Sequence, residues 1–329
     1  MLNRPIKLNM NEMPYPPPSG VFESALKELS NLNRYAEVED MELLRDLLAV
    51  YSDVKKENIV LSPGSDILLR ELIHSFSKDR KVVTVSPSFF PIVESAKRFS
   101  MKWVSIKLSP STFDLNPDIL MAQLNVPSLV IIDNPNNPTG RLLLDCGMVE
   151  SITKMTDTLL VIDEAYYEFS GVTFADMVND HANLAITRTM DKSFGLAGAR
   201  IGYTIAGKAF LDGINSFYPF LSRFSLSAAV EALREPDYMR ENIHKVIEER
   251  ERVCKALEKS GALVYSSDTN FLLVRTEIPD LKGRLEEMGI LIFDLSNQLP
   301  PRFVRVSIGK REDNDAFLSG YKKIYETIN

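Results

Sequence analysis

The residues best suited to covalent chemistry are a lysine and an arginine in one loop of small side chains, Lys192 and Arg200. The loop follows a short apolar segment that ends at Thr187. A lysine that is partly withdrawn from water favours its neutral amine, which can form a Schiff base with a carbonyl group. The planar guanidinium of an arginine suits a phosphate. Because most loop lysines are ordinary surface residues, this pair indicates a Schiff-base site only together with other segments.

An acid and a tyrosine follow a second apolar segment, Leu159–Asp163. An acid at the end of a buried strand stays charged only beside a partner, such as the protonated nitrogen of a heterocycle. Tyr166 could then reach a phenolic oxygen on the same ring. The alternative interpretation is that Asp163 caps the next helix.

Two further segments form turns where a ligand could bind. The turn at residues 133–140 contains Asn137, whose amide can donate to a ring oxygen or to a substrate carboxylate, although Asn, Pro and Gly also form plain turns. The turn at residues 62–64 leads into Ser65 and Asp66, where a glycine before a helix N-terminus offers an anion site. The alternative there is an ordinary helix start.

The elements that would position these residues alternate along the middle of the chain. Short apolar segments without polar alternation suit parallel strands that are covered on both faces, and helical stretches such as Met148–Met155 lie between them. The pattern predicts a doubly wound α/β unit with a mainly parallel sheet, and such folds bind ligands at the carboxyl ends of their strands. The four predicted strands are Val82–Val85, Ser128–Asp133, Leu159–Asp163 and Leu184–Thr187.

The last third of the chain predicts a smaller α+β unit. A long charged helix at Tyr238–Lys259 is followed by strand-like segments, by a helix near Pro279–Met288 and by a terminal helix. We expect an N-terminal arm at residues 1–35, a large unit at 36–235 and a small unit at 236–329. The strand-like segments of the small unit are Phe271–Arg275, Ile290–Phe293 and Phe303–Ile308.

Composition and charge argue against several classes of protein. The 329 residues carry a formal net charge of −7, which disfavours general binding to nucleic acids or to anionic membranes. Two widely separated cysteines, Cys146 and Cys254, argue against a disulfide framework or a zinc site. We expect no secretion signal, no membrane span and a cytoplasmic location.

Other catalytic and binding motifs are incomplete. Residues 202–208 have the spacing of a GxxxxGK phosphate loop but lack the Ser or Thr that should follow. The glycines around Gly198 lack the GxGxxG spacing of a dinucleotide site. The three histidines are isolated, so neither a catalytic triad nor a metal centre is indicated.

Taken in order, these segments resemble the fold-type I pyridoxal-phosphate enzymes, specifically the class I and II aminotransferases and, among them, the histidinol-phosphate aminotransferase family. Four more motifs are similar to signatures of that family: an asparagine-rich arm, an Asn-Arg-Tyr motif, an aromatic turn and a C-terminal arginine motif. The resemblance covers nearly the whole chain. These four motifs lie at residues 8–15, 33–35 with 43–45, 86–90 and 304–309.

The resemblance implies pyridoxal 5′-phosphate as the cofactor and assigns roles to individual residues. Lys192 would form the Schiff base and carry protons, and Asp163 would keep the pyridine nitrogen protonated so that the ring takes up electrons. The other implied contacts are Tyr166 and Asn137 to the ring oxygen, Phe89 to the ring face, Ser65, Asp66, Asp191 and Arg200 around the phosphate, and Arg305, Asn137 and Tyr15 to the substrate.

The resemblance also implies a homodimer with shared active sites, in which Tyr35 would reach the cofactor phosphate of the partner subunit. The implied reaction moves an amino group between an amino acid, or histidinol phosphate, and a 2-oxo acid in a ping-pong cycle. One alternative is an amino-acid-phosphate decarboxylase with the same cofactor. The other is a noncatalytic module that binds a cofactor or an amino acid, and the presence of Lys192 argues against it.

Two positions depart from the family pattern. Family members carry a small hydroxyl residue before the lysine, where this chain has Asp191. Two like charges about 4 Å apart repel by on the order of 4 kcal/mol at an effective dielectric constant near 20. We therefore expect Asp191 to turn away from the phosphate or to pair with a cation such as Arg188. The family's second substrate arginine corresponds to Phe293, which predicts an aromatic or bulky aliphatic amino acid rather than histidinol phosphate as the preferred substrate.

Overall fold

A sheet of seven strands forms the larger part of the fold, and the computed structural model describes residues 5–214 and 219–328. The order across this sheet is β2 (Ile59–Ser62), β8 (Gly202–Ala206), β7 (Leu184–Thr189), β6 (Thr158–Asp163), β5 (Ser128–Asp133), β3 (Lys81–Ser86) and β4 (Trp103–Lys107). The strands from β7 to β4 run parallel, whereas β8 pairs antiparallel with β7 and β2 antiparallel with β8.

The central strands β5, β6 and β7 are buried along their whole length. Successive side chains leave opposite faces of the sheet, so Ile132 and Ile162 join the core on one face while Ile131 and Val161 join a separate cluster on the other. Both faces are therefore apolar, which explains why these segments show no polar alternation in the sequence.

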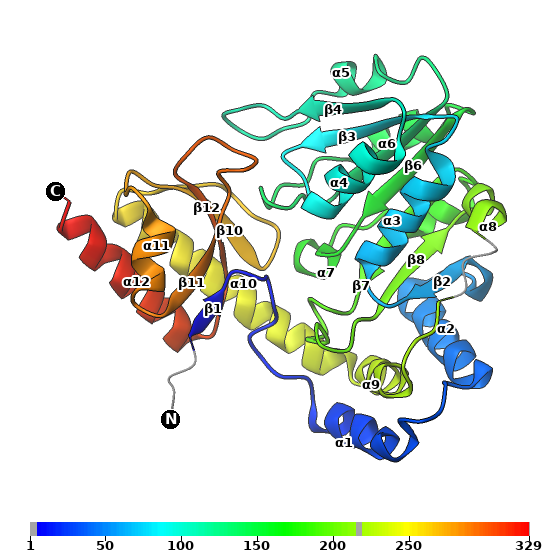
Figure 1. Ribbon diagram of the computed structural model, residues 1–329, viewed down its shortest axis with the longest axis horizontal. Helices are drawn as coiled ribbons and strands as arrows, with labels where there is room; N and C mark the ends of the chain where they lie inside the picture. Colours follow the sequence, from blue (N-terminus) through cyan, green and yellow to red (C-terminus); the bar gives the residue numbers. More distant parts are fainter. Residues whose placement is uncertain (1–4, 215–218, 329) are drawn as a thin grey trace.

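Helices cover both faces of this sheet (Figure 1). They are α1 (Ser19–Lys27), α2 (Val38–Ser52), α3 (Ser65–Phe76), α4 (Phe90–Phe99), α5 (Pro117–Met121), α6 (Cys146–Thr153), α7 (Tyr167–Ser170), α8 (Lys208–Ile214) and α9 (Arg223–Arg234), with 3-10 turns η1 (Glu28–Asn31), η2 (Lys56–Asn58) and η3 (Ala175–Asn179). Gly64, with φ 99°, turns the chain sharply from β2 into α3, in a conformation that favours glycine.

A second sheet of five strands lies beside the first (Figure 1). Its order is β1 (Ile6–Leu8), β11 (Ile290–Asp294), β12 (Phe303–Ser307), β10 (Phe271–Arg275) and β9 (Leu263–Val264), and its helices are α10 (Pro236–Lys259), α11 (Leu281–Glu286) and α12 (Arg311–Glu326). The N-terminal strand β1 pairs in parallel with β11. The chain then crosses to α1, which packs on α9 beside the large sheet.

The predicted fold class is confirmed, and the four predicted central strands run parallel to one another. The sequence analysis missed β4, whose side chains are mostly half-buried, and the short strands β1 and β9, which form no continuous apolar segment. Helix α9 ends at Arg234 and α10 begins at Pro236. The division of the chain after residues 35 and 235 stays a prediction.

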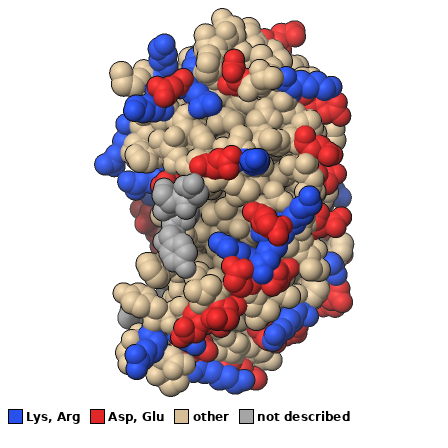
Figure 2. Space-filling view, turned by 90° about the vertical axis from the view of Figure 1, so that its right-hand side faces the viewer, with Lys and Arg blue, Asp and Glu red and all other residues tan. Residues whose placement is uncertain are grey.

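The surface carries charges of both signs. On the face shown in Figure 2, Lys and Arg side chains alternate with Asp and Glu rather than forming a continuous basic tract. Of the helices in the described ranges 5–214 and 219–328, none combines the length and the apolar character needed to cross a membrane.

Candidate active site

A cavity of about 540 Å³ lies where the carboxyl ends of the parallel strands meet the second sheet. This volume is in the range of small-molecule sites. The structure brings most of the sequence-predicted residues together in its lining: Ser65, Asp66, Phe89, Asn137, Asp163, Tyr166, Asp191, Lys192, Arg200 and Arg305. Two predicted residues, Tyr15 and Tyr35, are not part of this lining.

Asp163 ends strand β6 and is the buried acid of the cavity. Its carboxylate atom Oδ1 has no hydrogen-bond partner among the described residues. Burial, reinforced by the nearby Asp133, raises the pKa of Asp163 well above its ordinary value. The side chain does not cap a helix, since α7 has Tyr166 as its N-cap residue. A cationic group in the cavity would relieve the cost of ionising Asp163.

Asp133 lines the cavity, and the sequence analysis assigned it no role. It pairs in register with Asp163 at the end of β5, and its carboxylate accepts hydrogen bonds from Ser88 Oγ (2.8 Å), Asn136 Nδ2 (2.9 Å) and the Asn137 amide (2.7 Å). It also accepts from the Phe89 amide at 3.2 Å. Asp133 thereby fixes the turn that presents Asn137 and Phe89. Its position at a strand end beside Asp163 was a signal available in the sequence.

Lys192 follows β7, and its amine Nζ donates to the Met10 carbonyl oxygen at 3.3 Å. Arg200 lies close by and pairs with both Asp191 and Asp66. Burial raises the pKa of Asp191 to about 6, against the lowering effect of Arg200. Asp191 therefore does pair with a cation, as expected, but the cation is Arg200 rather than Arg188.

Arg188 is occupied elsewhere, beneath the cavity. Its guanidinium is buried against Glu164, with Nη2 2.9 Å from Oε2, and it stacks on the Tyr167 ring at 3.7 Å from the centroid. Nearby Glu168 is half-buried, and its desolvation raises its pKa to about 7 despite Arg188. This ionic cluster lies under the lysine loop and does not line the cavity.

A candidate anion site lies at the start of α3. Gly64 precedes the helix, Ser65 and Asp66 open it, and the guanidinium of Arg200 lies against this turn. The first amide groups of a helix have no partner within the helix and favour an anion. Because Arg200 is bound to two carboxylates, an entering phosphate competes with Asp66 and Asp191 for the same guanidinium.

Arg305 enters the cavity from β12 of the second sheet. Its Nη1 donates to Asn137 Oδ1 at 2.6 Å and its Nη2 to the Asn9 carbonyl oxygen at 2.8 Å, while Nε has no partner among the described residues. The guanidinium lies 4.6 Å from the Phe293 ring centroid. Burial lowers the pKa of Arg305. An arginine with an unpartnered donor in an apolar corner is suited to a substrate carboxylate.

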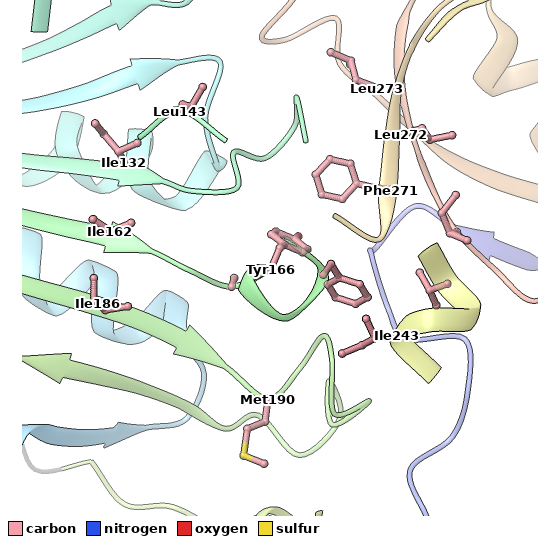
Figure 3. Close-up of a cluster of buried hydrophobic side chains, with 14 of the residues drawn as sticks. Ile132, Leu143, Ile162, Tyr166, Ile186, Met190, Ile243, Phe271, Leu272 and Leu273 are labelled. Carbon is pink, nitrogen blue, oxygen red and sulfur yellow. The ribbon is translucent and has the colours of Figure 1, made fainter. Parts of the chain in front are cut away.

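Tyr166 connects the two sheets at the floor of the cavity. Its ring meets Phe271 edge to face, with centroids 5.3 Å apart (Figure 3). Its hydroxyl accepts a hydrogen bond from Asn11 Nδ2 at 2.9 Å. Asn11 also lines the cavity, and the sequence analysis assigned it no role although it lies in the asparagine-rich arm motif.

The two tyrosines outside the lining lie in different surroundings. Tyr15 borders a neighbouring depression with Tyr238 and Phe194. Tyr35 is 79% exposed, and its ring lies tilted by 41° against that of Phe220, with ring centroids 5.2 Å apart. The predicted substrate contact of Tyr15 therefore lies outside the observed cavity. Tyr35 also lies outside this lining, and its contact with a partner subunit stays a prediction.

Comparison with known proteins agrees with this arrangement. The sequence model "Aminotransferase class I and II" matches residues 3–320. A histidinol-phosphate aminotransferase of Sulfurisphaera tokodaii is 33% identical, over 100% of this chain and 92% of the relative. The crystal structure of the histidinol-phosphate aminotransferase from Clostridium acetobutylicum superposes with a TM-score of 0.88 at 27% identity, covering 97% of this chain and 99% of that one.

Two further solved structures share the fold at 24% identity. One is a histidinol-phosphate aminotransferase from Sinorhizobium meliloti in complex with pyridoxal-5′-phosphate, with a TM-score of 0.87 over 98% of this chain and 91% of that one. The other is an L-threonine-O-3-phosphate decarboxylase from Porphyromonas gingivalis, with a TM-score of 0.85 over 97% and 99%. At this identity the likeness shows the fold alone.

A parallel sheet that ends in an acid, a loop lysine and an anion site, closed by a smaller sheet, defines a fold-type I pyridoxal-phosphate-dependent transferase. The chain belongs to the class I and II aminotransferases. It is an aminotransferase that uses pyridoxal 5′-phosphate and acts on small amino and 2-oxo acids.

Asp163→Asn should stabilise the cofactor-free protein at neutral pH. Because the pKa of Asp163 is raised on folding, its contribution to stability is full below the unfolded value of about 3.9 and is lost as the pH rises through the folded value. Asparagine cannot ionise and avoids this loss. Denaturant unfolding at pH 4.5 and pH 8 should show the gap between variant and parent widening with pH.

With pyridoxal phosphate added at pH 8, the parent should become more stable than Asp163→Asn. Asp163 then pairs with a cationic group, and a neutral asparagine forms no such ion pair. A gap that is independent of pH would show that Asp163 does not carry the buried charge.

Proposed function

We propose that the cofactor of this aminotransferase binds in the cavity with its ring over the floor and its phosphate at the start of α3. Three features support this fit. Asp163 offers a buried oxygen that has no partner among the described residues, the Gly64 turn leads into the first amides of α3 beside Arg200, and Tyr166 and Asn137 line the same cavity. Phe89, whose backbone amide donates to Asp133, would cover the ring face.

In this proposal each residue has one task. Bound pyridoxal phosphate supplies an aldehyde for amines and a protonated ring that takes up electrons. Asp163 holds the proton on the ring nitrogen, and Tyr166 with Asn137 orients the ring oxygen. Lys192 holds the cofactor between turnovers and moves the proton from the substrate Cα through its Nζ atom. Arg305 binds the α-carboxylate, replacing the Asn9 carbonyl oxygen with a charged partner.

The substrate side chain is proposed to be aromatic or bulky aliphatic. The observation that carries this proposal is the position of Phe293, whose ring packs against the Arg305 guanidinium on the cavity wall, with Leu295 beside it. In the described part of the chain, the cations that line the cavity are Lys192, Arg200 and Arg305, and each has a task already. A substrate phosphate at this wall would be poorly compensated.

Substrate preference tests this assignment. We expect kcat/KM for phenylalanine, tyrosine or leucine to exceed that for histidinol phosphate. Phe293→Arg should raise the ratio in favour of histidinol phosphate by about tenfold or more, the value of one charge-assisted hydrogen bond. Phe293→Leu is the matched control, since it removes the ring without adding charge. A parent enzyme that strongly prefers histidinol phosphate, as the names of its relatives suggest, would overturn the proposal.

Asp191 is proposed to weaken the hold on the cofactor phosphate. Above pH 6 its carboxylate is ionised and competes with the phosphate for Arg200. Asp191→Ser should therefore bind pyridoxal phosphate about tenfold more tightly at pH 8, with little gain at pH 5, where the parent carboxyl is protonated. Fluorescence titration of the cofactor-free protein measures both constants.

Asp191→Asn separates charge from the hydroxyl in the same titration. If repulsion between the Asp191 carboxylate and the cofactor phosphate weakens binding in the parent, Asp191→Asn should show most of the gain in cofactor affinity that Asp191→Ser shows. Weaker binding by both variants would show that Asp191 makes a favourable contact with the bound cofactor.

A homodimer with shared sites is proposed from one apolar face. Helices α1 and α9, the turn η1 and the start of α2 pack together there, and large apolar side chains on them remain exposed. A monomer gains nothing from such a surface, whereas a second copy would cover it. The exposed residues are Phe22, Leu26, Leu29, Leu32, Tyr35, Val38 and Phe220.

The location in the cytoplasm likewise remains our proposal.

Subunit mixing tests the role of Tyr35. If Tyr35 completes the partner's site, mixing Tyr35→Phe with Lys192→Ala protein should restore intact sites, up to about a quarter of all sites at equal amounts in exchanging dimers. Activity above that of either variant alone is the expected outcome. If Tyr35 acted within its own chain, mixing would restore none. Size exclusion of each variant confirms that both still form dimers.

A further inference from the structure

Residues 9–11 of the N-terminal segment cross the cavity, and each contacts one of its polar groups. The carbonyl oxygen of Asn9 accepts from Arg305 Nη2 (2.8 Å), and that of Met10 accepts from Lys192 Nζ (3.3 Å). The side-chain amide of Asn11 donates from Nδ2 to the Tyr166 hydroxyl at 2.9 Å. The contact of Asn11 is the one made by a side chain and is therefore open to mutation.

Asn11 is held on every side. It is 1% exposed and has φ 52°, in the left-handed region that asparagine tolerates better than most residues. Its backbone amide donates to Ser307 Oγ at 2.8 Å, and its carbonyl oxygen accepts from Asn270 Nδ2 at 3.0 Å. The side-chain oxygen Oδ1 lies 2.8 Å from Ser307 Oγ.

This network determines which way the Asn11 amide faces. Ser307 Oγ accepts from the Asn11 backbone amide and donates its single hydrogen to Oδ1. With the amide reversed, Nδ2 would face Ser307 Oγ, and the hydroxyl hydrogen of this buried serine would lose its acceptor. The orientation with Nδ2 toward Tyr166 satisfies all of these groups.

The orientation has a consequence for Tyr166. Its hydroxyl oxygen accepts from Asn11, and within residues 5–214 and 219–328 no acceptor is found for its hydrogen. The hydrogen is therefore free to point into the cavity, which Tyr166 lines. A carboxylate at position 11 would do the opposite, because it would accept the hydrogen and turn it away.

We propose that Asn11 is a positioning residue that makes Tyr166 a hydrogen-bond donor toward the ring oxygen of the bound cofactor. The proposal rests on the proposed function, in which Tyr166 contacts that oxygen. A donor there stabilises the deprotonated ring oxygen, so it eases loss of the proton that this oxygen shares with the nitrogen joining Lys192 to the cofactor. Asn11 touches neither cofactor nor substrate in this account and acts through Tyr166.

The test is the pH midpoint of the visible absorbance of the bound cofactor, which reports that proton in the resting holoenzyme. Tyr166→Phe should raise the midpoint by about one unit, the effect of one lost hydrogen bond to a charged oxygen. Asn11→Asp should raise it by a similar amount. In the Tyr166→Phe background, Asn11→Asp should add little, because the hydroxyl through which it acts is gone.

Asn297→Asp is the matched control, since it adds the same charge to an exposed position on the same cavity and should shift the midpoint much less. Asn11→Gly keeps the left-handed backbone and removes the amide, so it should give a smaller rise than Asn11→Asp, and it carries the test if Asn11→Asp does not fold.

The outcomes separate the two proposals. An unchanged midpoint in Tyr166→Phe would refute the role of Tyr166 and with it the proposed function of that residue. A shift in Tyr166→Phe without one in the Asn11 variants would refute the role of Asn11 alone. A shift from Asn11→Asp that persists in full without the Tyr166 hydroxyl would show a direct effect of charge and would likewise overturn the inference.

Discussion

The site depends on two buried carboxylates that lie in register at the ends of neighbouring strands, Asp133 and Asp163. They share one environment but differ in their partners. Within the part of the chain that the structure describes, four donors surround Asp133, whereas one oxygen of Asp163 has no hydrogen-bond partner. Burying a charge without a partner costs free energy, so the ionised form of Asp163 is unfavourable until a cationic group binds beside it. Asp133 holds the surrounding turns in place. Ionised Asp163 would be stabilised by a cation beside it, and a protonated ring nitrogen would be such a cation.

Much of the large sheet could be predicted because its cause is local. Strands that are covered on both faces consist mostly of apolar residues, so β5, β6 and β7 could be recognised in the sequence as short apolar segments. The residues that follow such strands converge at one edge, so Asp163 and Lys192 could be placed in one cavity. Edge strands such as β4 are half-buried, and their sequence carries no comparable pattern.

What the sequence left open concerns contacts between distant segments. Asp133 belongs to no recognised sequence motif. Its structural role comes from the hydrogen bonds that it accepts from Ser88 and Asn136, and the folded structure is needed to see that Ser88 reaches it. Asp191 was assigned the wrong partner because the fold pairs Arg188 with Glu164 and brings Arg200, nine residues further along the chain, against Asp191. Asn11 meets Tyr166 because β1 joins the second sheet, and no local signal predicted that pairing.

The two sheets are joined both by the chain itself and by hydrogen bonds across the cavity. The chain passes between them twice, through residues 9–18 and at Glu235, and these passages are tied together where the Tyr238 hydroxyl donates to the Pro16 carbonyl oxygen at 2.9 Å. Away from these passages, the Ser88 backbone amide donates to Gln298 Oε1 at 3.3 Å, and both residues line the cavity. A neutral hydrogen bond contributes about 1 kcal/mol, roughly twice the thermal energy. The bond from Ser88 to Gln298 acts together with the contact of Arg305 Nη1 to Asn137 Oδ1 at 2.6 Å and that of the Asp268 backbone amide to the Gly140 carbonyl oxygen at 2.8 Å, so drawing the two sheets apart would require several hydrogen bonds to break together.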